Sequence, residues 1–224
     1  MLLGGTFDPV HTGHVDIASH FCRLFHACQL RIVPAGNPWQ KPPLFATSAQ
    51  RSRMLELAFE SASLPFELDS QEIVRQGASY TIDTLRAVRK EVGFGPSLVL
   101  VMGSDQLVNL HTWREWEKLF DYAHLAVAKR VGSAVSPADV DDEVGRVFFP
   151  RLALPHDIRR TSFGRTCLSE EVFVDVSSTE IRKNIHEANA AELLIPPAVL
   201  DYIKTNKLYM QDINGYQTTP GNCY

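Results

Sequence analysis

The sequence predicts an α/β protein built on a doubly wound, mostly parallel sheet. Short apolar segments alternate with amphipathic helical segments along most of the chain, which is the pattern of βαβ units. One apolar segment, Ser97–Met102 (SLVLVM), has almost no polar position, as expected for a strand buried on both faces of a parallel sheet. Polar stretches follow several of these strands, and ligands of such sheets bind beyond the carboxyl ends of the strands.

Hydrophobic periodicity and breaker residues place the individual elements. Ile82, Leu85 and Val88, for example, share one face of a helix that Gly93–Pro96 ends. The expected strands are Met1–Leu3, Leu30–Pro34, Phe66–Asp69, Ser97–Met102, His124–Lys129, Val147–Leu154 and Val172–Val176. The expected helices are His14–Phe25, Ser48–Glu60 with Ser48 as its N-cap, Tyr80–Glu91, a stretch closing at Leu119–Phe120, Ser177–Ile185 and Pro197–Asn206.

Composition excludes several classes of protein. The 224 residues are 45% hydrophobic with a formal net charge of −4, and this mild acidity argues against a nucleic-acid partner, which requires a basic face. No apolar run approaches the ~20 residues of a membrane span, and no signal peptide is recognisable, so no membrane partner is expected. The four cysteines form no Cys-x-x-Cys pair and no metal-ligand cluster, which predicts reduced thiols, no protein-bound metal and a cytoplasmic location.

The opening stretch, MLLGGTFDPVHTGH, carries the first candidate site. Gly4 and Gly5 are expected to let the backbone turn sharply and approach a ligand. A helix then begins near Thr12–Gly13, and a helix N-terminus presents N–H groups and partial positive charge to phosphate. His11 and His14 are three residues apart, so both imidazoles can project towards such an anion. The stretch matches neither a Walker loop nor the Gly-x-Gly-x-x-Gly fingerprint.

A second candidate anion site lies at Val176–Arg182, where a strand ends in Ser-Ser-Thr and a helix follows. The hydroxyls and N–H groups of that first turn can hold an anion, and Arg182 adds a fixed charge with a planar fork. The alternative is an ordinary capping box, with Ser177 as the cap and Glu180 three residues on. A second phosphate site on an α/β chain favours the functional interpretation.

The two motifs together resemble the signatures of the HxGH nucleotidyltransferase superfamily. Gly4–His14 is similar to the first signature, and Ser177–Arg182 (SSTEIR) is similar to the second, usually written Ser-Ser/Thr-x-x-Ile/Leu-Arg. Further stretches resemble the bacterial nicotinate-nucleotide adenylyltransferase family: NPWQK at 37–41, SYTIDTL at 79–85, MGSD at 102–105 and TWREWE at 112–117. The resemblance implies a Rossmann-like nucleotidyltransferase domain over residues 1–209, which leaves 210–224 as a mobile C-terminal tail.

The resemblance implies a reaction of NAD biosynthesis. AMP passes from ATP, accompanied by Mg²⁺, to nicotinate mononucleotide, and nicotinate adenine dinucleotide and pyrophosphate form. It also implies that His11 and His14 contact the ATP phosphates, with His14 stabilising the charged transition state. The implied ATP-binding residues are Gly5, Thr6, Phe7, His11, His14, Gly103, Ser104, Asp105 on the ribose, and Ser178, Thr179 and Arg182 on the β- and γ-phosphates.

A mononucleotide subsite is implied as well. The flat nicotinate ring suits an aromatic platform, and the indole of Trp113 offers one. The family supplies backbone amides for the nicotinate carboxylate near Thr81 and around Trp113 and Arg114. The candidate residues on this side are Lys41, Tyr80, Thr81, Trp113, Arg114 and Arg130, with Lys41 and Arg130 on the mononucleotide phosphate.

Several alternatives stay open at this stage. Phosphopantetheine adenylyltransferases share the first signature but are usually shorter and lack Thr-Trp-x-x-Trp, and a cytidylyltransferase or a nucleotide-binding regulator without turnover is a further choice. Trp113 and Trp116 have plain packing as their alternative, and Trp39 is a candidate lid residue in the loop Ala35–Ala46. The oligomeric state is open, a homo-oligomer included. Because family members usually carry a few more residues before the two glycines, we expect either a start upstream of Met1 or a clipped first strand.

Overall fold

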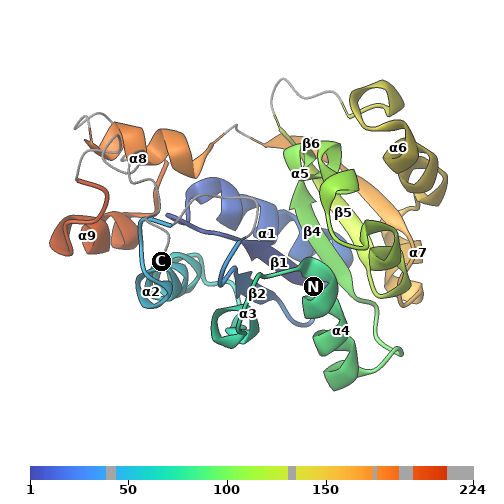
Figure 1. The fold of residues 1–224 in the computed structure, drawn as a ribbon, viewed down its shortest axis with the longest axis horizontal. Helices are drawn as coiled ribbons and strands as arrows, with labels where there is room; N and C mark the ends of the chain where they lie inside the picture. Colours follow the sequence, from blue (N-terminus) through green and yellow to red (C-terminus); the bar gives the residue numbers. More distant parts are fainter. Residues whose placement is uncertain (39–43, 131–134, 174–175, 187–193, 211–224) are drawn as a thin grey trace, which may run out of the picture.

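A six-stranded sheet lies at the centre of the computed structural model, which describes residues 1–38, 44–130, 135–173, 176–186 and 194–210. Within these residues the strand order is β3-β2-β1-β4-β5-β6, and every adjacent pair is parallel. This doubly wound order confirms the predicted fold class. In Figure 1, β1 and β4 run through the middle, α8 and α9 lie towards one end, and α6 and α7 lie towards the other.

The elements have the following bounds. The strands are β1 Leu2–Gly5, β2 Arg31–Pro34, β3 Glu67–Leu68, β4 Val99–Gly103, β5 His124–Arg130 and β6 Thr166–Phe173. The helices are α1 Thr12–Phe25, α2 Ser48–Ser61, α3 Gln71–Val74, α4 Thr81–Val92, α5 Ser104–Val108, α6 Asp142–Phe148, α7 Pro155–Arg160, α8 Ser178–His186 and α9 Pro197–Thr205. Short 3₁₀ turns cover Leu110–Thr112, Trp116–Asp121, Pro137–Asp139 and Phe149–Arg151.

The strands bury side chains on both faces of the sheet. Leu3 of β1 packs into the cluster formed with α1, α2, α8 and α9, whereas its neighbour Leu2 packs into the cluster formed with α4, α5 and α6. This alternation follows from the two-residue period of a strand. It explains why Val99–Met102, the part of SLVLVM that belongs to β4, is apolar throughout. The two clusters hold β1 and β4 side by side and thereby fix the edge where the chain's motifs meet.

Three predictions about local structure are wrong. Gly4 and Gly5 do not turn the chain but form the end of β1, paired with Val33 and Pro34; the turn comes at Phe7, whose φ is 50°. The predicted strand Val147–Leu154 is the end of helix α6 and a 3₁₀ turn.

Helix α6 forms there for two reasons. The Asp141 carboxylate caps the helix by accepting from the Glu143 N–H at 2.8 Å. Val144 and Phe148, which are four residues apart, both face the core. The third error concerns α2. Its N-cap is Thr47 rather than Ser48, and the Thr47 hydroxyl accepts from the Gln50 N–H at 3.3 Å.

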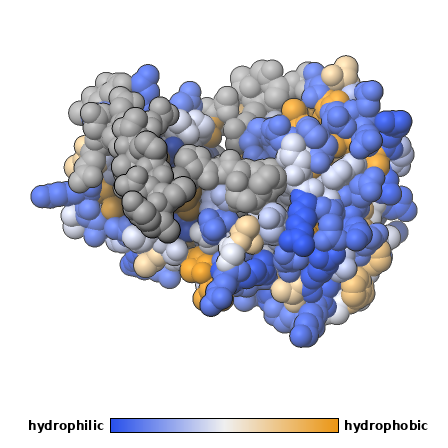
Figure 2. Space-filling model, in the orientation of Figure 1, coloured by the Kyte–Doolittle hydropathy of each residue, from blue (hydrophilic) through white to orange (hydrophobic). Residues whose placement is uncertain are grey.

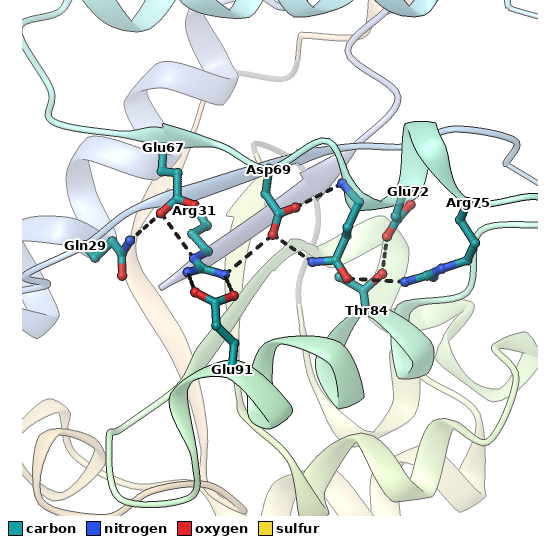
Figure 3. A network of polar contacts seen from close by, with 9 residues as sticks. Gln29, Arg31, Glu67, Asp69, Glu72, Arg75, Thr84 and Glu91 are labelled. Carbon is teal, nitrogen blue, oxygen red and sulfur yellow. Dashed lines mark hydrogen bonds and ion pairs between the residues drawn. The ribbon is translucent and has the colours of Figure 1, made fainter.

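A buried arginine ties one edge of the sheet to helix α4. Arg31, the first residue of β2, is 7% exposed and forms a bidentate ion pair with Glu91 near the end of α4. It also lies near Glu67 at 3.4 Å and Asp69 at 3.7 Å, so that β2, β3 and α4 meet at one guanidinium (Figure 3). The network fixes helix α4, which begins at Thr81 directly after Ser79 and Tyr80.

Among the coloured residues on the face shown in Figure 2, most are hydrophilic, and the hydrophobic ones form small separate groups. Across the described part of the chain, none of the helices has both the length and the apolar composition needed to cross a bilayer. The predicted tail lies outside the described residues from position 211 onwards, as does the 174–175 part of the strand predicted at Val172–Val176.

Candidate active site

A cavity of about 510 Å³ opens beyond the carboxyl ends of β1 and β4. This is the switch point of the sheet, because the chain passes from β1 outwards to β2 on one side and to β4 on the other. Both signature motifs and the two polar stretches after β4 reach it. Its lining includes Gly4, Gly5, Thr6, Asp8, His11, His14, Glu72, Ser79, Tyr80, Thr81, Thr84, Gly103, Asp105, Trp113, Arg114, Ser177, Ser178, Thr179 and Arg182.

The first signature forms a tight loop under the cavity floor. The Phe7 side chain is fully buried, and a Cβ on Gly5 would lie 3.0 Å from its ring. Arg51, 1% exposed on α2, donates to the main-chain oxygens of Thr6 at 2.8 Å and Ala35 at 2.7 Å. Arg51 therefore fastens the loop to the end of β2. Gly5 is required for packing against Phe7 rather than for turning.

His11 and His14 stack on each other at the start of α1. Their ring centroids are 3.6 Å apart with an angle of 28° between the planes. The Phe7 and His14 rings pack edge to face, with their centroids 4.9 Å apart. The His11 backbone N–H donates to His14 Nδ1 at 3.3 Å. A neutral His14 therefore carries its ring proton on Nε2, which is the nitrogen it can use as a donor. Both rings line the cavity.

The second signature contacts the first directly. Ser178 Oγ donates to the Pro9 oxygen at 2.9 Å, and Arg182 Nη1 donates to the Asp8 oxygen at 2.6 Å. Burial lowers the pKa of Arg182 while the Asp8 carboxylate opposes that shift; the group stays cationic.

The capping alternative for this motif is also present, since Ser177 Oγ accepts from the Glu180 N–H at 3.1 Å. Capping by Ser177 leaves Ser178, Thr179 and Arg182 along the cavity wall.

Asp8 lies inside the first signature, but the sequence did not single it out as a site residue. Its side chain is 2% exposed, and its carboxylate accepts from the N–H groups of Phe45 at 2.8 Å and Ala46 at 3.1 Å. The Tyr209 hydroxyl donates to the same carboxylate at 2.8 Å. A buried carboxylate needs such donors to remain charged. No local sequence signal links these four residues.

The stretch after β4 supplies another wall of the cavity. Gly103 ends the strand and Asp105 lies exposed in the first turn of α5, where both line the cavity. Ser104, a predicted ATP-binding residue, is 3% exposed and is not among the described residues that line the cavity. Phe7 is likewise absent from that described lining. Both therefore support the walls from behind.

Four residues of the predicted mononucleotide subsite gather on the opposite wall. Tyr80 precedes helix α4, Thr81 begins it, and the guanidinium of Arg114 lies 4.8 Å from the centre of the Tyr80 ring. Trp113 lines the cavity, and its buried indole Nε1 has no hydrogen-bond partner within the described residues. Trp116 is 8% exposed and belongs to the core, as its packing alternative predicts.

This wall also contains a carboxyl group that sequence reasoning missed. The Glu72 side chain lines the cavity and accepts from the Thr84 hydroxyl at 2.6 Å (Figure 3). Burial raises the pKa of Glu72. Gly36 packs against its main chain, since a Cβ there would lie 1.9 Å from the Glu72 oxygen. The spacing of Glu72, Ser79 and Thr84 in the sequence gave no hint of this cluster.

Some of the predicted residues lie outside the described part of the chain. Lys41 and Trp39 fall within 39–43, and Arg130 ends β5 with a side chain that is not described. Within the described residues, no three His, Cys, Asp or Glu side chains lie close enough to form a metal-binding group.

Comparisons with known proteins agree with this geometry. Residues 2–184 match the cytidylyltransferase-like family. A Herminiimonas arsenicoxydans protein named probable nicotinate-nucleotide adenylyltransferase is 45% identical over 93% of this chain and 95% of its own. One from Dechloromonas aromatica with the same name is 35% identical over 93% and 96%. The Plasmodium falciparum nicotinic acid mononucleotide adenylyltransferase complexed with NaAD superposes with a TM-score of 0.69 at 18% identity, covering 93% of this chain and 95% of that one, which shows the shared fold.

The fold, the two signatures and the matched family define the chain as a nucleotidyltransferase of the cytidylyltransferase-like class. The curated relatives, which this chain matches over nearly their whole length, identify the family within this class. The chain belongs to the nicotinate-nucleotide adenylyltransferase family, as the sequence motifs predicted.

Proposed function

We propose that the chain transfers the AMP part of ATP to nicotinate mononucleotide, giving nicotinate adenine dinucleotide and pyrophosphate in NAD biosynthesis. The observation that carries this proposal is one cavity that joins the two signature motifs to a wall bearing Trp113 and Arg114. In this proposal, ATP and the mononucleotide bind side by side at the switch point. A cytoplasmic location fits ATP as a cosubstrate, and a homo-oligomer remains part of the proposal.

The chemistry requires positioning more than proton transfer. The attacking group is a phosphate monoester whose second pKa is about 6, so it is mostly a dianion at neutral pH and needs no general base. It attacks the α-phosphate of ATP in line with the leaving pyrophosphate. The protein's contribution is to hold the two phosphates in contact and to neutralise charge as it develops.

The cations and donors around the first signature suit this task. His14 Nε2 supplies a donor for the α-phosphate oxygens, and His11, stacked on it, holds the imidazole in place. Arg182, Ser178 and Thr179, which line the cavity, are the proposed partners of the β- and γ-phosphates. Asp105, exposed in the first turn of α5 just after β4, is the acceptor proposed for the ribose hydroxyls.

The mononucleotide occupies the Trp113 wall in this proposal. The indole provides a stacking face for the nicotinate ring, and the amides at the start of α4 near Thr81 provide donors for its carboxylate. Arg114 and Tyr80 close the same side. Lys41 and Arg130 remain the proposed partners of the mononucleotide phosphate.

Mg²⁺ fits the proposal as a companion of ATP. The Asp8 carboxylate is occupied by three donors, and the described residues offer no cluster of three ligands, so the ion would be held mainly by the nucleotide phosphates and water. When bound, it neutralises charge on the departing pyrophosphate.

The test is product identification with purified protein, ATP, Mg²⁺ and nicotinate mononucleotide. The proposal predicts equimolar pyrophosphate and a dinucleotide with the mass of nicotinate adenine dinucleotide. Release of ADP or inorganic phosphate instead, or no consumption of ATP, contradicts it.

A further inference from the structure

Tyr209 brings the C-terminal part of the described chain against Asp8, behind the cavity wall that carries Arg182. It follows α9, is 7% exposed, and has a φ of 62°, a conformation rare for a side-chain-bearing residue. Its hydroxyl donates to Asp8 Oδ1 at 2.8 Å across 201 positions of sequence. Burial, followed by the neighbouring Asp8 carboxylate, raises the pKa of Tyr209, so the phenol keeps the proton that it donates.

Asp8 connects this phenol to the loop that precedes α2. One carboxylate accepts the Tyr209 hydroxyl together with the N–H groups of Phe45 and Ala46. Loss of any donor from a buried carboxylate leaves part of its charge unsatisfied. The position of Phe45 therefore depends on Asp8, and the position of the Asp8 carboxylate depends in part on Tyr209.

Phe45 and Asp8 in turn hold Arg182. The Arg182 guanidinium lies 4.6 Å from the centre of the Phe45 ring, a cation–π contact, and it donates to the Asp8 main-chain oxygen at 2.6 Å. Its Nε atom is buried and forms no hydrogen bond within the described residues. The guanidinium also donates to Thr179 Oγ1 at 3.3 Å. Two of the three groups that orient it, Phe45 and Asp8, therefore depend on the carboxylate bound by Tyr209.

We propose that Tyr209 is a positioning residue for ATP, acting through Asp8 and Phe45 on the guanidinium of Arg182. The proposal rests on ATP occupying the cavity as argued above. Tyr209 does not line the described cavity wall and touches neither substrate. Its effect is confined to the half of the cavity that holds the ATP phosphates, on the far side from Trp113.

The test compares Tyr209→Phe with wild-type protein. Because the ring is retained, the variant keeps its packing and loses only the hydroxyl. We expect the Kd of a non-hydrolysable ATP analogue, measured by calorimetry, and the KM for ATP to rise about 5- to 10-fold. This is less than the roughly 10- to 150-fold that the direct loss of a hydrogen bond to a charged group would give, because the loss reaches Arg182 only through Asp8 and Phe45. The KM for nicotinate mononucleotide should stay within about twofold, because none of the described contacts that link Tyr209 to Arg182 involves the wall that carries Trp113.

Two controls make the result specific. Tyr202→Phe removes a hydroxyl from half-buried Tyr202 on α9 and should leave both KM values unchanged. In an Asp8→Asn background, Tyr209→Phe should add less than about a twofold further rise in the Kd of the analogue, because the shared carboxylate is gone.

Equal rises of both KM values, an unchanged Kd in Tyr209→Phe, or full additivity with Asp8→Asn would each overturn the positioning role. Failure of the wild-type protein to bind the analogue would instead refute the proposed function.

Discussion

Arg86 and Glu115 form a bidentate ion pair that joins helix α4 to the turn carrying Trp113. The two Arg86 Nη atoms donate to Oε1 at 3.2 Å and Oε2 at 2.7 Å, and Lys118 adds a third hydrogen bond at 2.7 Å. Glu115 has a φ of 52°, which non-glycine residues seldom adopt. The ion pair therefore holds a strained turn, and Trp113 with it, against the helix that begins at Thr81.

Glu115→Ala should make the turn that carries Trp113 less rigid and so weaken binding at the Trp113 wall. The predicted result is a rise of about 3- to 10-fold in the KM for nicotinate mononucleotide with the KM for ATP unchanged, on the scale of one lost ion-pair network. Steady-state kinetics with each substrate varied measures both values. Glu117→Ala, an exposed carboxylate two residues on, is the matched control. An equal effect of the control, or a parallel rise in the KM for ATP, would show that Glu115 has no selective role.

The same ion pair predicts a pH dependence of stability. Hydrogen bonds from Arg86 and then Lys118 lower the pKa of Glu115 from 4.5 to about 2. A depressed pKa stabilises the folded state above the unfolded value of 4.5, and that contribution is lost as the pH falls from 4.5 to 2. Glu115→Gln should therefore lower the free energy of unfolding at pH 6, with a difference that shrinks below pH 4.5. Urea unfolding at several pH values measures it, and a difference independent of pH speaks against the assignment.

Gly4 and Gly5 should differ sharply in their tolerance of a methyl group. A Cβ on Gly5 would lie 3.0 to 3.3 Å from the fully buried Phe7 ring, whereas the nearest atom to one on Gly4 is the Val33 oxygen at 4.0 Å. Gly5→Ala is expected to destabilise the fold by about 1–3 kcal/mol, as overpacking does, and Gly4→Ala to be near neutral. Denaturant unfolding distinguishes the two. Equal stabilities would mean that the Phe7 ring moves freely.

His14→Ala should reduce kcat by at least about 100-fold, because it removes a donor proposed to act on charge that develops in the transition state. The KM for ATP should change much less. The exposed His156 provides a control, and His156→Ala should retain wild-type kcat. A His14→Ala variant that turns over at nearly the wild-type rate would remove His14 from the mechanism.

The fold was predictable because burial leaves a strong local pattern. The apolar run of β4 and the helical stripe of α4 each specify their element without reference to distant residues. The same pattern gave a wrong prediction for Val147–Leu154. Its apolar residues suit either a strand or a helix, and the deciding signal was the acidic cap at Asp141, outside the segment.

The residues of the site also fall into those that a local sequence pattern reveals and those that it does not. His11, His14, Ser178 and Arg182 belong to contiguous signatures and were found from sequence, and the fold brings them to one cavity. Contacts between distant segments could not be predicted from the sequence. The hydrogen bond from Tyr209 to Asp8, for example, depends on how α9 packs. The roles of these residues in binding and turnover remain predictions until the variants are measured.

The central claim is that this cavity selects nicotinate mononucleotide as the acceptor of AMP. The most direct measurement is kcat/KM for pyrophosphate release with nicotinate mononucleotide, nicotinamide mononucleotide and phosphopantetheine, at fixed ATP and Mg²⁺. The account predicts the highest value for nicotinate mononucleotide and much lower values for the other two acceptors. An equal or higher kcat/KM for either of them would contradict it.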